Sequence, residues 1–246
     1  MNTEYHKWYS PNLDREMELK VYGHAGSSFV LFPTQGGRFF QAEDEGIMES
    51  VSGFINEGRI NIIAVDSIDN ESWSNRNLSL HEKGLRHVRY ESYLLGEVVP
   101  FIRNRFPGQD YRIGCTGFSM GGYHAANFFF KHPDVFGTVI AISGFYNLRV
   151  LVGDDSDELV YFNSPNLFLR NLEDPAILHQ MRNSRIVVCV GQGAWEEEML
   201  AETLALKAIL EEKAIPAWVD IWGKDVNHDW PWWRKMLPYF IEKSGF

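Results

Sequence analysis

The chain has 246 residues, of which 45% are hydrophobic and 23% are charged. This ordinary globular composition leaves ample material for a single domain over residues 1–246. The formal net charge of −10 argues against nucleic acid and anionic membranes as partners. The polar start of the chain lacks the features of a secretory signal, and no apolar run approaches the roughly 18 residues of a membrane span. We therefore expect a soluble, cytoplasmic protein.

The first elements of the chain alternate between strand and helix patterns. Met17, Leu19 and Val21 alternate with charged residues, which predicts a half-exposed antiparallel strand. Short apolar runs with helical segments between them follow, a pattern typical of a mostly parallel sheet with helices on both faces. We thus predict an α/β fold. The strands are expected at residues 29–32, 60–65, 111–115, 138–142, 186–190 and 217–222.

Helical periodicity is clear in three places. Residues 47–55 and 200–210 carry apolar side chains at helical spacing. Residues 85–106 predict a long helix with Val88, Leu95 and Val99 facing inward, and Pro100 is expected to kink it or end its first half. Residues 145–183 fit no period, so we interpret them as an excursion over the mouth of the sheet.

Two cysteines, Cys115 and Cys189, lie inside apolar runs that we expect to be buried strands. This placement favours reduced core thiols over a disulfide. Neither their number nor their spacing supports a thiolate metal site. We expect no metal and no cofactor.

The sharpest motif is Gly117-Phe118-Ser119-Met120-Gly121, between the strand expected at 111–115 and the helical run 123–131. A serine on such a strand-to-helix turn is held in strained backbone geometry, and flanking glycines avoid collisions with neighbouring backbone. We predict that Ser119 is a catalytic nucleophile on an α/β-hydrolase fold.

A serine nucleophile needs a histidine base oriented by a carboxylate, here in the chain order serine, acid, histidine. Of the eight histidines, His228 directly follows the last expected strand, where catalytic groups of parallel sheets collect. Glu196, after the strand at 186–190, is our choice for the acid. Its alternatives are Glu197, Glu198, Asp225, Asp154, Asp155 and Asp157.

The tetrahedral intermediate needs backbone N–H donors for its oxyanion. Met120, directly after the serine, supplies the first. The second is expected in the loop after residues 29–32, where Gln35 is our choice and Thr34 and Gly36 are alternatives.

Aromatic residues crowd the same loops. Trp73 and Trp195 lie just after expected strands, beside polar residues, and we predict that they line the substrate pocket. Trp232 or Trp233 is expected to anchor the last helix. The tryptophan-rich segment near the C-terminus would also suit a contact between copies in a homo-oligomer.

The chain resembles the putative esterase family of α/β hydrolases, which includes esterase D and the mycolyltransferases. The resemblance is carried by Gly117–Gly122, by Val65-Asp66-Ser67-Ile68-Asp69 with Ser72-Trp73, and by Asn227-His228-Asp229-Trp230. It implies Ser119 as nucleophile, His228 as base and a carboxylate at Glu196. The Glu196 loop replaces the aspartate-bearing loop of esterase D, which weakens any case for formylglutathione as substrate.

We therefore predict a serine carboxylic ester hydrolase that forms an acyl-enzyme on a small-molecule ester. One alternative is an acyltransferase with the same acyl-serine chemistry. Another is a non-catalytic binding protein on the hydrolase fold.

Overall fold

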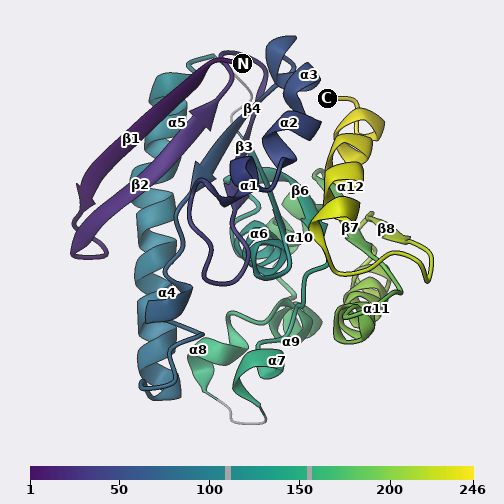
Figure 1. Ribbon diagram of the computed structural model, residues 1–246. Helices are drawn as coiled ribbons and strands as arrows, with labels where there is room; N and C mark the ends of the chain where they lie inside the picture. The colour runs from purple at the N-terminus through teal and green to yellow at the C-terminus, as the bar shows by residue number, and fades with distance from the viewer. Residues whose placement is uncertain (109–111, 154–156) are drawn as a thin grey trace.

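The computed structural model describes residues 1–108, 112–153 and 157–246. Its strands form an eight-stranded sheet in the order β1-β2-β4-β3-β5-β6-β7-β8 (Figure 1). Strands β3 to β8 pair in parallel, while β2 is antiparallel to β1 and β4. This mixed, mostly parallel sheet confirms the α/β prediction. The strands are β1 (Thr3–Ser10), β2 (Arg15–Tyr22), β3 (Ser27–Phe32), β4 (Ile60–Val65), β5 (Ile113–Phe118), β6 (Phe136–Ile142), β7 (Arg185–Val190) and β8 (Trp218–Ile221).

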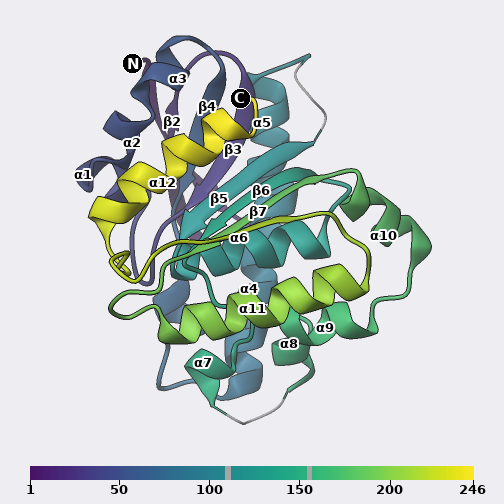
Figure 2. The ribbon, with the colours of Figure 1, turned by 90° about the vertical axis from the view of Figure 1, so that its right-hand side faces the viewer.

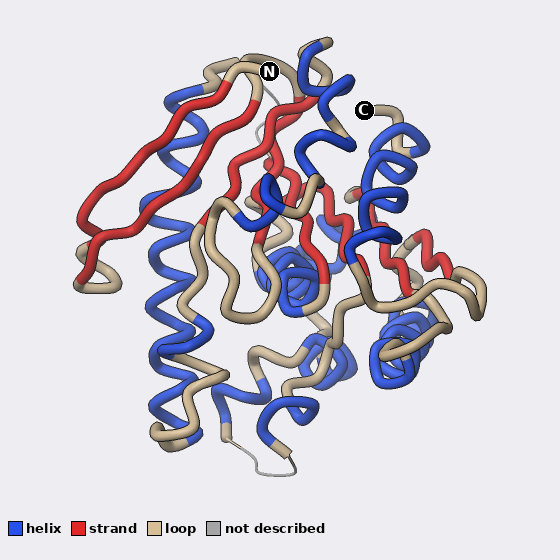
Figure 3. The backbone as a smooth tube through the Cα atoms, in the orientation of Figure 1, coloured by secondary structure: helices blue, strands red, loops and turns tan. Residues whose placement is uncertain are grey.

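Helices cover both faces of the sheet, as Figures 2 and 3 show. One face carries α1 (Gln41–Asp44), α2 (Ile47–Ser50), α3 (Ser52–Asn56) and α12 (Trp230–Lys243). The other face carries α4 (Leu80–Tyr93), the π-helical turn η2 (Leu94–Val98), α5 (Val99–Arg105), α6 (Met120–Lys131), α10 (Pro175–Arg182) and α11 (Glu197–Glu212).

The core therefore consists of two apolar layers divided by the sheet. In β4, where every residue is buried, Ile63 and Val65 join the layer under α4 to α6. Ile62 and Ala64 join the layer under α12. Alternate side chains of a strand point to opposite faces, so a sheet covered on both faces needs continuous apolar strands.

The N-terminal strand β1 was missing from the sequence prediction. Its residues alternate between exposed and half-buried up to the buried Ser10, and the strand pairs only with β2 among the described residues. It carries no apolar run. The turn residues Pro11, Asn12 and Asp14 between β1 and β2 were the available signal for this hairpin. Strand β5 also extends to Phe118, beyond the expected end at Cys115, while Tyr111 lies outside the described residues.

The long helix continues through Pro100 instead of ending there. It begins at Leu80, capped by Ser79 and Glu82 in a capping box. Just before the proline the backbone widens into the turn η2, in which the Val99 N–H donates to the Leu94 carbonyl. A single π-helical turn of this kind changes the hydrogen-bond spacing locally, and the helix continues through Pro100.

The inward face of this helix also differs from the prediction. Its buried residues include His87, Tyr90 and Leu94. Val88 is only half-buried, whereas the half-buried Leu95 packs against the core as expected. The expectation for Val99 was correct. The buried histidine and tyrosine pack against other aromatic rings.

The excursion at 145–183 folds into short helices beside the layer of α4, α6 and α11 (Figure 1). Phe145, Leu148 and Val160 pack with Trp73 and Met120, which brings the excursion next to Ser119. That the excursion covers a bound substrate stays a prediction. The helices are α7 (Arg149–Val152), α8 (Glu158–Tyr161), α9 (Pro165–Phe168) and η3 (Leu169–Asn171), followed by α10.

Both cysteines are free and buried, as expected. Burial raises the pKa of the Cys115 and Cys189 thiols, so neither is an activated nucleophile. None of the helices in the described part of the chain combines the length and apolar character needed to cross a membrane.

Candidate active site

Ser119 lies on a sharp turn between β5 and α6, as the motif predicted. Its backbone has φ 55° and ψ −122°, a region that side chains rarely occupy and that costs conformational strain. The Ser119 N–H donates to the Ile142 carbonyl (3.0 Å), which fixes the turn on the neighbouring strand. The side chain is half-buried at the carboxyl edge of the sheet.

The glycines of the motif permit backbone packing that a side chain would block. A Cβ on Gly117 would lie 2.4 Å from the Gly121 backbone, and one on Gly121 would lie 2.3 Å from the Phe32 carbonyl oxygen. The turn therefore closes on itself and also packs directly on the end of β3. This close approach brings the loop after β3 beside Ser119.

His228 and Glu196 meet at the same edge of the sheet. Glu196 follows β7 and is 0% exposed, and its Oε2 lies 3.2 Å from His228 Nδ1. The loops that carry the two residues are joined by backbone bonds, among them His228 N to Ala194 O (3.0 Å). The Asn227 side chain accepts from Ala194 N (2.9 Å). The pair is thus held by its backbone as well as by its own contact.

Two residues that the sequence prediction missed support this pair. Ser143, directly after β6, donates to Glu196 Oε1 (2.5 Å) and accepts from Trp233 Nε1 (3.1 Å). The Gly191 N–H also points to Glu196 Oε1 (3.4 Å). A buried carboxylate needs such donors. A Ser-Gly pair directly after a buried strand was the signal for Ser143 in the sequence.

Trp233 links the histidine to the serine turn. Its ring stacks on Phe118, the residue before Ser119, with ring centroids 5.4 Å apart, and meets the His228 ring edge-on at 5.0 Å. It is buried in the core, which confirms its expected role as an anchor of α12.

Among the described residues, the Ser119 hydroxyl has no hydrogen bond, so its approach to His228 stays a prediction.

Of the alternative acids, those in the described structure form no hydrogen bond or ion pair with His228. Glu197 and Glu198 are exposed in the first turn of α11, where the helix dipole favours acids. Asp225 is exposed. Asp157 caps α8 and lies 3.1 Å from His81. Asp154 and Asp155 fall outside the described residues.

The loop after β3 offers one uncommitted N–H near its tip. Thr34 N donates to Gln41 Oε1 (3.0 Å) and Gly36 N to Asp69 Oδ2 (3.4 Å), while Pro33 has no N–H. Within the described residues no partner takes the N–H of Gln35 or that of Met120. Of the three residues considered for the second donor, Gln35 is therefore the one whose backbone is available.

The loop is also held at its far end by Asp66. This carboxylate accepts from Arg38 Nε (2.6 Å) and Phe39 N (3.2 Å). Burial raises the pKa of Asp66, although the Arg38 guanidinium opposes that shift.

The two tryptophans expected in the substrate pocket lie in different surroundings. Trp73 is 1% exposed and packs against Met120 and the excursion. Trp195 is 81% exposed with a left-handed backbone, φ 68°, beside Glu196. Trp195 thus faces solvent, whereas Trp73 packs behind the serine turn. Their contact with a substrate stays a prediction.

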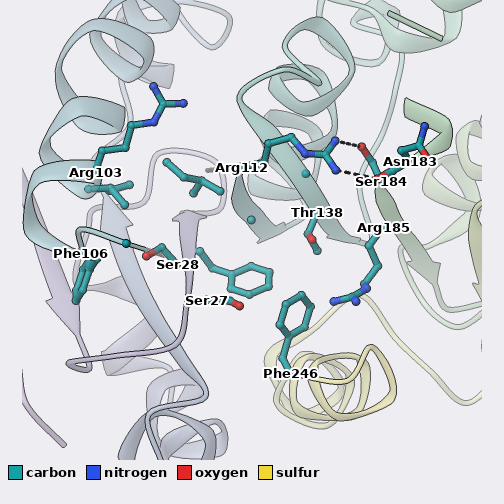
Figure 4. Close-up of a pocket in the computed structure, with 16 residues that line it drawn as sticks. Ser27, Ser28, Arg103, Phe106, Arg112, Thr138, Asn183, Ser184, Arg185 and Phe246 are labelled. Atoms are coloured by element: carbon teal, nitrogen blue, oxygen red, sulfur yellow. Dashed lines mark hydrogen bonds between the residues drawn. The ribbon is translucent and has the colours of Figure 1, made fainter. Parts of the chain in front are cut away.

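A separate cavity of about 620 Å³ opens at the opposite, amino-terminal edge of the sheet (Figure 4). Arg112 there donates to Ser184 Oγ (2.9 Å) and to the Asn183 carbonyl (2.8 Å). Because it lies at the other ends of β3, β5 and β7, this cavity is not part of the Ser119 site. Among the described residues, no group of three or more histidine, cysteine or acidic side chains could hold a metal ion.

Comparison with known proteins decides the family. A family model described as "Putative esterase" matches residues 10–241. The chain belongs to this family. This membership confirms the resemblance seen in the sequence and supports ester hydrolysis as the class of activity.

Relatives of this esterase-family chain match it over nearly their whole length. The uncharacterized protein YjcH of Bacillus subtilis is 22% identical over 96% of this chain and 95% of its own. A ferulic acid esterase structure has a TM-score of 0.75, with 15% identity over 98% of each chain. The fluorophosphonate-binding serine hydrolase FphF of Staphylococcus aureus has a TM-score of 0.72, with 16% identity over 98% of this chain and 97% of its own. These likenesses establish the α/β-hydrolase fold.

Proposed function

We propose that this chain is a serine carboxylic ester hydrolase that acts through an acyl-enzyme on Ser119. The observation that carries the proposal is the contact between His228 Nδ1 and the buried Glu196 carboxylate (3.2 Å), at the sheet edge that also presents Ser119 on its strained turn. Membership of the esterase family supports the same chemistry.

The roles follow from the chemistry of each group. Glu196 accepts a hydrogen bond from the Nδ1–H of His228, which leaves Nε2 unprotonated and able to take the Ser119 hydroxyl proton. The alkoxide attacks the ester carbonyl, and the N–H groups of Met120 and Gln35 receive the negative charge on its oxygen. Protonated His228 then gives its proton to the leaving alcohol. In the second half of the reaction, His228 takes a proton from water, and the resulting hydroxide attacks the carbonyl of the acyl-enzyme. His228 then returns the proton to Ser119 as the free acid leaves. We expect the Ser119 hydroxyl to form its hydrogen bond with His228 Nε2 when a substrate binds.

The substrate that we propose is a small ester with an aromatic or short acyl group. Trp195 stands exposed beside Glu196, where its ring could cover such a group. The ferulic acid esterase that shares the fold makes methyl ferulate a suitable substrate to try beside short p-nitrophenyl esters.

The test is hydrolysis of p-nitrophenyl butyrate by the native chain and by Ser119→Ala. We expect kcat to fall by at least about 10⁴-fold in Ser119→Ala, because the nucleophile and its partners act as a unit. Ser244→Ala, after the end of α12, is the matched serine control and should keep full activity. Unchanged hydrolysis in Ser119→Ala would disprove the mechanism.

Labelling and product analysis separate this proposal from its alternatives. A fluorophosphonate probe should modify Ser119, as located by mass spectrometry, and absence of labelling would favour a non-catalytic protein. Adding a short alcohol during the reaction should still give mainly the free acid. A predominant new ester would instead indicate an acyltransferase.

A further inference from the structure

A buried aspartate joins the loop after β3 to the helix that begins at the serine turn. Asp69 follows β4 and is 1% exposed. Its Oδ1 lies 2.8 Å from Nε2 of His124, which is just over one turn into α6. Its Oδ2 accepts from the Gly36 N–H (3.4 Å) in the loop. One carboxylate thus contacts both segments that we propose as the oxyanion site.

The His124 ring is fixed by its neighbours. It stacks on His87 and Phe128, with centroids 5.5 and 5.9 Å apart and interplanar angles of 16° and 9°, and is 1% exposed. His124 Nδ1 is buried with no partner among the described residues. Nε2 of His124 therefore carries a proton and donates a hydrogen bond to Asp69, because a lone proton on Nδ1 would be buried without an acceptor.

Asp69 also supports the loop through its own backbone. Its carbonyl accepts from Ser74 N (2.9 Å), and Ser74 Oγ accepts from the Gln35 side chain (2.8 Å). Gly36, which carries the contact with the carboxylate, has φ 68° and so turns the chain at the tip of the loop. These bonds hold the Gln35 side chain and the Gly36 N–H, and they leave the Gln35 N–H itself uncommitted in the described structure.

We infer that Asp69 and His124 are positioning residues that hold the Gln35 N–H at a set distance from the Met120 N–H. The inference rests on the proposed function of Ser119. An oxyanion donor is effective only within about 2.7–3.1 Å of the oxyanion, and a displacement of about 1 Å can cost roughly 10²-fold in rate. A buried bond between loop and helix prevents that displacement.

The test compares two substitutions of His124. Phenylalanine preserves the ring stack but removes the donor to Asp69, and we expect kcat for p-nitrophenyl butyrate to fall about 10- to 100-fold. KM should stay within about threefold, since oxyanion donors act mainly in the transition state. His124→Gln places an amide N–H near the former Nε2 and should recover most of kcat.

A control within the same ring stack distinguishes positioning from stability. His87→Phe changes a neighbouring buried histidine that forms no hydrogen bond with the loop in the described structure. Its kcat should stay within about twofold of the native value, a change of less than about 0.5 kcal/mol in the barrier. Thermal midpoints of all variants show that each is folded at the assay temperature. Native kcat in folded His124→Phe, or an equal loss in His87→Phe, would overturn the inference.

Asp69→Asn provides a second route if His124→Phe does not fold. Its single acceptor oxygen can serve Gly36 or His124 but not both, so kcat should again fall while KM holds, and an unchanged kcat would refute the inference. The Ser119→Ala result separates the two proposals. If Ser119→Ala remains active, the proposed function fails; if it is inactive but His124→Phe and Asp69→Asn behave as native, only the positioning role fails.

Discussion

Ser143 shows how a single residue outside the proposed triad can control its geometry. It is 0% exposed and has a left-handed backbone, φ 51°. Its hydroxyl donates to Glu196 and accepts from Trp233. Glu196 can turn only if this hydroxyl loses its partner. Backbone strain at such a position is consistent with a functional constraint.

We predict that Ser143→Ala lowers kcat for p-nitrophenyl butyrate by about tenfold, equivalent to ~1.4 kcal/mol in the barrier. The expected cause is a less well oriented Glu196. Ser143→Gly also lacks the hydroxyl but accepts the left-handed backbone without strain. A similar loss of kcat in both variants would assign the effect to the hydroxyl, whereas full activity in both would contradict the prediction. Steady-state kinetics measure kcat, and thermal midpoints measure the stability of both variants.

At the scale of elements, the excursion is attached to α11 through a half-buried acid, Glu202. Glu202 Oε2 accepts from the Asn166 side chain (2.7 Å) and from Tyr146 N (3.3 Å). Burial raises the pKa of Glu202, while those hydrogen bonds oppose the shift. The ionised form is therefore disfavoured in the folded chain relative to the unfolded chain.

The sign of this shift predicts that Glu202→Gln stabilises the protein at neutral pH. A group whose folded pKa is raised contributes stability below its unfolded pKa and loses that contribution as pH rises through the folded pKa. The neutral amide avoids the loss, and we expect its thermal midpoint to be about 2 °C higher at pH 8. The advantage should shrink toward pH 4.5. A lower midpoint than the native chain at pH 8 would contradict the prediction.

At the scale of the whole molecule, α4 and α6 share a buried cluster of aromatic and polar rings against the sheet. His87 lies within it, stacked on Phe128 and His124 and hydrogen-bonded to Asn127 (3.3 Å). Burial lowers the pKa of His87 well below its ordinary range, and the nearby His124 and Lys131 charges add to the shift. The folded protein therefore holds His87 neutral at pH values where the unfolded chain would protonate it.

This shift predicts that His87 contributes to acid sensitivity. With its folded pKa lowered, the stability that it contributes is present above the unfolded pKa of about 6.5 and is lost as pH falls below that value. Denaturant unfolding of the native chain and of His87→Phe between pH 8 and pH 5 measures the effect. We expect the free energy of unfolding to fall less steeply with decreasing pH in His87→Phe than in the native chain. The same pH dependence in both proteins would disprove the prediction.

Contacts between copies of the chain through its C-terminal tryptophans stay a prediction at this scale. Trp233 is buried within one copy, whereas Trp230 and Trp232 are only half-buried.

The sequence by itself determined the central parallel strands and the turn at Ser119. Both signals are local: apolar runs report burial on two faces, and glycines around Ser119 report close backbone packing. The positions of Glu196 and His228 after expected strands, in the order serine, acid, histidine, favoured this pair over its alternatives, and the fold brings the two residues into contact.

Only the tertiary structure decided which polar residues are buried and what they contact. Strand β1 has no apolar run and exists through its pairing with β2. Trp73 is enclosed by the excursion, and the bonds of Ser143 to Glu196 and of Asp69 to His124 each join residues more than fifty positions apart. Local periodicity carries no information about such contacts, because they depend on how separate elements pack around the sheet.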